Sequence, residues 1–127
     1  MKIVLGTVFG LIASFATNYI VLLLFMRMDA SADLNDPEAL AEFIKGFTTF
    51  DYMVPLAAHL FGVLAGLLTA RAICKTSALP LVIVMTFHMA ATVLNLFAIP
   101  HPVWFAIVDI VGPMLIFIPF IKTQKQP

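Results

Sequence analysis

Charged residues are scarce in this sequence: Asp, Glu, Lys and Arg make up only 11% of the 127 residues, whereas 62% are hydrophobic. A soluble domain of this length exposes much of its surface to water and needs polar side chains to cover it. The formal net charge is zero, and the basic residues form no run of the kind that binds nucleic acid. We therefore expect a lipid bilayer to surround the chain, and we expect no nucleic-acid partner.

Cysteine is nearly absent as well, since Cys74 is the only one. A single cysteine excludes both an internal disulfide and a C-x-x-C metal site. No nucleophile stands beside a candidate base in the sequence, and no cofactor fingerprint is present. We interpret Ser14 as a packing residue and Cys74 as a loop residue. The sequence thus predicts a protein that is not an enzyme and holds no cofactor.

Long apolar runs, in contrast, fill most of the chain. A helix needs roughly 20 residues to cross the ~30 Å hydrocarbon core of a bilayer, and each run holds about 19–23. The first run could instead be a secretory signal peptide, but the apolar part of such a peptide is usually only about 7–15 residues. We predict an all-α bundle of four transmembrane helices in a single domain over residues 1–127, with the first run retained. The predicted spans are Ile3–Phe25, Tyr52–Ala70, Leu79–Ile99 and Val103–Ile121.

The loop from Met26 to Asp51 is long enough to hold structure of its own. Asn35 as the N-cap and Glu38 three residues later fit a capping box. Apolar residues follow at helical spacing and predict a short amphipathic helix over residues 37–45, lying flat on the bundle surface. Two roles are open for it: a connector that keeps its own apolar side dry, or a lid over a site between the helices. The apolar residues are Leu40, Phe43, Ile44 and Phe47.

Basic residues near the ends of the runs predict the orientation of the chain. Positive side chains concentrate on the cytoplasmic side of membrane proteins. Only Arg27 and Lys45 belong to the side of the long loop, whereas five belong to the opposite side. This distribution predicts that both termini are cytoplasmic and that the long loop is outside. The five are Lys2, Arg71, Lys75, Lys122 and Lys125.

Small residues recur at every fourth position in the first two runs. Helices associate in lipid through close backbone approach, which such ridges of small residues allow. The two ridges can pack the first helix against the second within one chain, or one of them can form a homodimer contact. The first ridge consists of Gly6, Gly10 and Ser14, continued by Asn18, and the second of Ala58, Gly62, Gly66 and Ala70.

Five polar side chains lie within the apolar runs, where each needs a partner or a function because hydrocarbon does not solvate it. At about 1.5 Å of rise per residue, four of the five come out about 6–10 Å below the outer helix ends. His88 comes out deeper, at about 16 Å, near the midplane. All four helices thus contribute a polar group, and most of these groups share one depth. The five are Asn18, His59, His88, Asn95 and Asp109.

Three interpretations of this polar set are open. The side chains could only hold the helices together, for example Asp109 with a histidine and Asn18 with Asn95. They could line an outward-facing pocket that binds or passes a proton, an ion or a small solute, because histidine titrates near neutral pH. They could also form a metal site from two histidines and one carboxylate: His59, His88 and Asp109. His101, in its Pro-x-Pro turn, is interpreted as a solvated loop residue.

Three stretches of the chain carry a resemblance to other proteins: Ala58-His59-Leu60-Phe61-Gly62, then Asn95, and then Pro100-His101-Pro102-Val103-Trp104-Phe105 with Asp109. In these the chain resembles a group of small, uncharacterised bacterial four-helix integral membrane proteins. The resemblance covers most of the chain and implies the fold, but it brings no activity with it. Together with the predicted orientation, it implies a multi-pass protein of the bacterial inner (cytoplasmic) membrane. We expect a small transport or binding protein, or an accessory subunit of a larger membrane complex.

Overall fold

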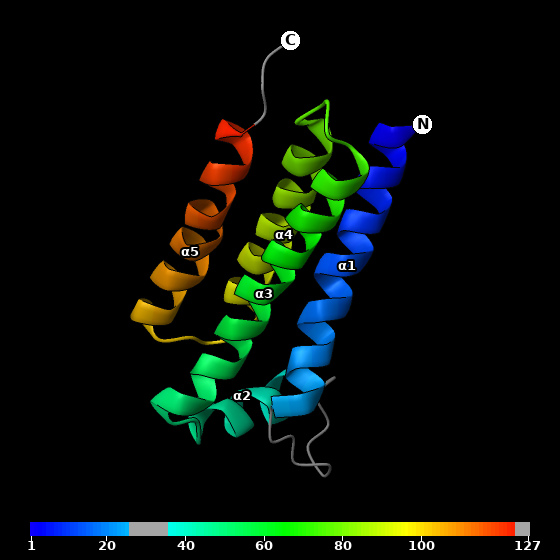
Figure 1. The fold of residues 1–127 in the computed structure, drawn as a ribbon. Coiled ribbons are helices and arrows are strands. Elements are labelled where there is room, and N and C mark those ends of the chain that lie inside the picture. The colour runs from blue at the N-terminus through cyan, green and yellow to red at the C-terminus, as the bar shows by residue number, and fades with distance from the viewer. Residues whose placement is uncertain (26–35, 124–127) are drawn as a thin grey trace.

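The computed structural model describes residues 1–25 and 36–123, and within these the chain is entirely helical apart from turns and connections (Figure 1). Four of its helices are long and apolar enough to cross a membrane, as expected of a multi-pass membrane protein. Large apolar side chains cover the outside of the bundle, where lipid would contact them. The predicted four-helix bundle is confirmed. The helices are α1 (Lys2–Phe25), α2 (Pro37–Lys45), α3 (Thr49–Ile73), α4 (Leu79–Ala98) and α5 (Val103–Lys122).

The predicted bounds hold within one residue at each end of α1, α4 and α5, but α3 is longer than its apolar run. It begins at Thr49 rather than Tyr52, because Asp51 accepts hydrogen bonds from the Thr48 backbone N–H at 2.8 Å and from the Thr48 hydroxyl at 2.6 Å. It also continues past Ala70 to Ile73. Apolar runs mark the part of a helix that lipid covers, whereas capping decides where the helix itself begins.

The short helix α2 has the predicted range of 37–45, but its cap differs from the prediction. The N-cap is Asp36, whose carboxylate accepts a hydrogen bond from the Glu38 backbone N–H at 2.9 Å. The predicted cap, Asn35, lies outside the described residues. Pro37 occupies the first helical position, where its missing N–H costs nothing. With Pro37 at the first helical position, the N-cap falls on Asp36, the residue directly before it.

The two ridges of small residues pack α1 against α3 within the chain. Every residue of both ridges is buried except Asn18, which is half-buried. A Cβ atom on Gly66 would come within 2.8 Å of the Ser14 Cβ and 2.9 Å of the Gly10 carbonyl oxygen, and one on Gly62 would come within 2.8 Å of the Ser14 carbonyl oxygen. The backbones therefore approach as closely as glycine allows. Because the contact is already formed inside the chain, these ridges are not available as a homodimer contact.

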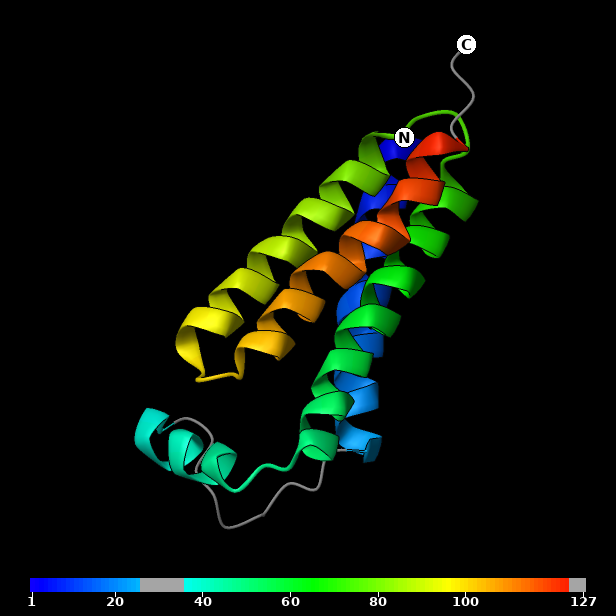
Figure 2. The ribbon, with the colours of Figure 1, turned by 90° about the vertical axis from the view of Figure 1, so that its left-hand side faces the viewer.

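The ends of the bundle differ. The start of α1 and the end of α5 are both at one end of the bundle, which we name the terminal end, and α2 lies across the other, the α2 end (Figure 1). In the half near the terminal end, buried apolar side chains close the space between α3 and α4. Towards the α2 end, α1 and α3 reach further than α4 and α5, and α2 lies below the α4–α5 connection (Figure 2). The buried apolar cluster comprises Val63, Leu67, Ala70, Leu81, Val84 and Met85.

Candidate binding site

A pocket of about 360 Å³ lies at the α2 end. It is between α2 and the ends of α1 and α3, which extend beyond α4 and α5. Its lining comes from α1, α2, α3, the end of α4 and the α4–α5 connection. Most of this lining is aliphatic or aromatic, and the polar groups are few. The volume and the mainly apolar lining with a few polar groups are those of small-molecule sites. The lining residues are Tyr19, Leu22, Leu23, Leu40, Ile44, Phe47, Tyr52, Pro55, His59, Asn95, Ile99 and His101.

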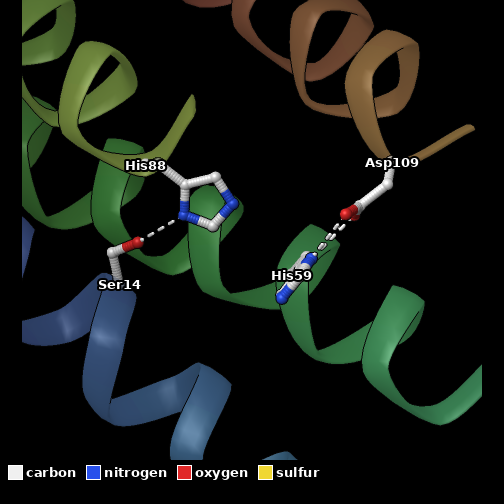
Figure 3. Close-up of polar contacts among 4 residues, drawn as sticks. All are labelled: Ser14, His59, His88 and Asp109. Atoms are coloured by element: carbon white, nitrogen blue, oxygen red, sulfur yellow. Dashed lines mark hydrogen bonds and ion pairs between the residues drawn. The ribbon is translucent and has the colours of Figure 1, made fainter. Parts of the chain in front are cut away.

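His59 connects this pocket to a carboxylate buried in the bundle. Its Nδ1 atom lies 2.7 Å and 2.9 Å from the two carboxylate oxygens of Asp109 (Figure 3). Asp109 is fully buried and His59 is 9% exposed. The other ring nitrogen, Nε2, lies on the side of the ring turned away from Asp109 (Figure 3). Of the two predicted partners for Asp109, the structure thus selects His59, which lines the pocket.

A second buried pair lies beside the first. The Ser14 hydroxyl and the His88 Nδ1 atom are 3.1 Å apart, and His88 is only 3% exposed. The His59 and His88 rings are perpendicular, with centroids 6.1 Å apart. No described residue forms a hydrogen bond with His88 Nε2. Ser14, predicted only as a packing residue, therefore also positions a histidine. The predicted difference in depth between His59 and His88 does not prevent their rings from lying close together.

The two asparagines of the predicted polar set are placed differently. Asn95 lines the pocket, and Asn18 does not. Asn18 instead lies against α3, where its Cβ would be 3.2 Å from a Cβ on Gly62. Within the described part of the chain, no hydrogen bond joins Asn18 to Asn95. The predicted amide pair is therefore wrong. The structure brings together His59, His88 and Asp109 and adds Asn95 to the pocket.

Aromatic rings form one rim of the pocket and include a residue that sequence reasoning missed. Tyr52 contacts Phe47 at 5.4 Å and Trp104 at 6.2 Å between ring centroids. His101 stacks on Phe105 at 4.6 Å and 14°, and its Nδ1–H donates to the Ile99 carbonyl at 2.6 Å. His101 is therefore half-buried at the rim of the pocket and is not only a solvated loop residue. The available signal in the sequence was the pair of aromatic residues Tyr52 and Trp104, which stand at the starts of the second and fourth apolar runs.

Burial of His101 lowers its pKa below the ordinary value of 6.5, and this outweighs the raising effects of the Ile99 carbonyl and of Asp109. A proton that the unfolded chain accepts near pH 6.5 is thus disfavoured in the folded protein. We expect the free energy of unfolding to fall as the pH is lowered through 6.5, and to fall less in His101→Gln, which keeps a donor for Ile99 but does not titrate. Unfolding titrations between pH 8 and pH 5 would measure both slopes. Equal slopes would contradict this assignment.

The geometry does not favour a metal site. Among the described residues, no group of three or more His, Cys, Asp or Glu side chains is arranged to hold a metal ion. Both Asp109 oxygens are within hydrogen-bond distance of the His59 Nδ1 atom. The carboxylate therefore orients the histidine and is not presented to the pocket as a ligand.

Comparisons with known proteins add no assignment: no family model, no curated protein and no solved structure matches this chain.

Proposed function

We propose that this protein binds a small, largely apolar solute in the pocket at the α2 end. The observation that carries the proposal is a mainly apolar pocket of about 360 Å³ lined by the His59 imidazole, which a buried carboxylate orients. A histidine that served only to join helices would need no such pocket beside it. Sites that combine mainly apolar walls with a few placed polar groups typically bind small molecules.

Binding fits the interior of the bundle better than passage across it. Among the described residues, the buried histidines and Asp109 lie no nearer the terminal end than the level of His88 and Ser14, near the middle of α4 and α1. From there to the terminal end, the buried apolar cluster around Val63, Leu67 and Val84 closes the space between the helices. Beyond the level of His88, the Thr7 hydroxyl of α1 is buried without a hydrogen-bond partner among the described residues. An ion or a proton would find no continuous row of polar groups to replace water along this stretch of the described chain. The pocket is therefore a site open at one end.

The short helix α2 supports the lid interpretation over the connector interpretation. Its residues Leu40 and Ile44 line the pocket, and Ile44 is buried. The apolar side of α2 thus faces the pocket. A solute would enter past α2 and be covered by it. In the orientation that the basic residues predict, this end faces outward from a bacterial inner membrane, so that the solute would come from outside the cell or from the outer leaflet.

Filling the pocket tests this proposal. In lipid nanodiscs, 2-undecanone at about tenfold its dissociation constant should raise the thermal midpoint by about 3–6 °C, because it binds only the folded state. Leu40→Trp should remove the shift, since the larger ring occupies the pocket. Leu94→Trp, the same change at an exposed position of α4 outside the pocket, should keep it. Circular dichroism measures the midpoint. An equal shift in Leu40→Trp, or no shift in the unmodified protein, would refute pocket binding.

An accessory role in a larger membrane complex is the second candidate. The observation that favours it is the exposed apolar surface of α1, on which Phe9, Ile12 and Phe15 lie. Co-purification with a larger partner through this face, lost when Ile12 is replaced by a bulkier tryptophan, would support it.

A further inference from the structure

The carboxylate behind His59 decides which hydrogen-bonding group the pocket offers. Asp109 is fully buried, and its two oxygens both lie near the same imidazole nitrogen, Nδ1. Among residues 1–25 and 36–123, no Lys, Arg, Asp or Glu lines the pocket. A net charge is costly in such apolar surroundings, so the histidine and the carboxylate are most stable in states that together carry none.

Two protonation states of the pair have zero net charge. In the first, His59 is an imidazolium and Asp109 a carboxylate, and both ring nitrogens carry a proton. In the second, Asp109 is a carboxylic acid that donates to Nδ1, and the neutral ring must then carry its single proton on Nε2. Both states therefore place an N–H group on Nε2, the nitrogen turned away from Asp109 (Figure 3). Only the state with a net negative charge leaves a lone pair there.

We infer that the pocket selects an uncharged molecule with a carbonyl-type oxygen; this inference rests on the proposed function. The oxygen accepts a hydrogen bond from the His59 Nε2–H group, and the apolar body of the molecule fills the space under α2. The apolar walls suit a hydrocarbon chain or ring. A carboxylate ligand would accept the same bond but would leave a net negative charge in the pocket. At His59 an ammonium ligand would meet a donor where it needs an acceptor. An alkane would leave the N–H group without a partner.

Four probes of one chain length test this inference: 2-undecanone, undecane, undecanoate and undecylamine. The affinity of each probe is obtained from the shift that it causes in the thermal midpoint of the protein in nanodiscs. The probe concentration is corrected for the amount that partitions into protein-free nanodiscs. The ketone should bind about five- to tenfold more tightly than undecane, the preference that one hydrogen bond gives. The variant His59→Phe/Asp109→Ala should lose this preference and still bind both, because it keeps an apolar pocket and leaves no unpaired carboxylate. Asn95→Leu removes another lining donor and tests whether Asn95, rather than His59, supplies the bond. Leu94→Trp, outside the pocket, should keep the preference.

The outcomes separate the two proposals. Equal affinity for ketone and undecane in the unmodified protein, or tighter binding of undecanoate or undecylamine, would overturn the inference and leave pocket binding intact. A preference that Asn95→Leu removes would overturn the assignment of the donor to His59. Failure of all four probes to shift the midpoint would instead overturn the proposed function. A ketone preference that disappears only in the His59 and Asp109 variant supports the inference.

Discussion

Asp109→Ala is expected to lower the free energy of unfolding by about 3–5 kcal/mol, the range measured when one partner of a buried ion pair is removed. The side chain is fully buried and bonded to His59 at 2.7 Å, so that its loss leaves the His59 Nδ1 atom without a partner. Reversible unfolding in mixed micelles with increasing SDS would measure the change. Glu42→Ala, which removes an exposed carboxylate paired with Lys45, is the matched control and should change stability little.

The double variant His59→Phe/Asp109→Ala should restore most of this loss. It roughly conserves the total side-chain volume and leaves neither member of the pair as a buried polar group without its partner. Replacing a buried ion pair with apolar groups is often neutral or stabilising. A double-mutant cycle over the four proteins gives the coupling energy of the pair. A double variant as unstable as Asp109→Ala would show that the pair is needed to hold the helices together, and would weaken the case that its role is in the pocket.

Gly66→Ala is expected to lower the free energy of unfolding by about 1–3 kcal/mol, because overpacking a close contact forces backbone shifts. The new methyl group would lie 2.8 Å from the Ser14 Cβ and 2.9 Å from the Gly10 carbonyl oxygen, neither of which can move without separating α1 from α3. Such a separation would also displace Ser14 from His88. The effect on stability would therefore be accompanied by a change in the buried polar pairs.

Gly112→Ala is the control for this prediction. Its added methyl group would meet the Leu60 Cδ2 atom at 2.7 Å, the end of a flexible side chain that can turn aside. Alanine also has the higher helix propensity, by about 1 kcal/mol. We therefore expect Gly112→Ala to be neutral or slightly stabilising in the same SDS titration. Equal destabilisation by the two variants would mean that the α1–α3 contact is not as close as the structure has it.

Most of the fold follows from local properties of the sequence. The four apolar runs set the spans, and the amphipathic spacing after Pro37 set the range of α2. The predicted start of α3 at Tyr52 differed from its observed start at Thr49, because hydropathy reports lipid contact and not capping. The ridges of small residues indicated a close helix contact but not its partner, since the same ridge can pack within a chain or between chains.

The candidate site could be predicted only in part. Shared depth brought His59 and Asp109 to one level, because rise per residue is a property of the helix alone. Depth could not give the rotation of each helix about its axis, which is why Asn18 and Asn95 were wrongly paired. His101 was missed because its partial burial comes from tertiary contacts: it stacks on Phe105, a residue of the following helix, and it lines the pocket.

The sequence by itself determined that this chain is a bundle of four apolar helices with a short amphipathic helix between the first two, because length, hydropathy and period act locally along the chain. It also determined which polar groups would have to be satisfied inside the bundle. Only the tertiary structure decided that His59, and not His88, bonds to Asp109, and that a pocket opens under α2. The physical reason is that the histidine pairing and the pocket depend on how the helices are placed relative to one another. They depend on how far α1 and α3 extend beyond α4 and α5, and on how closely glycine lets α1 and α3 approach.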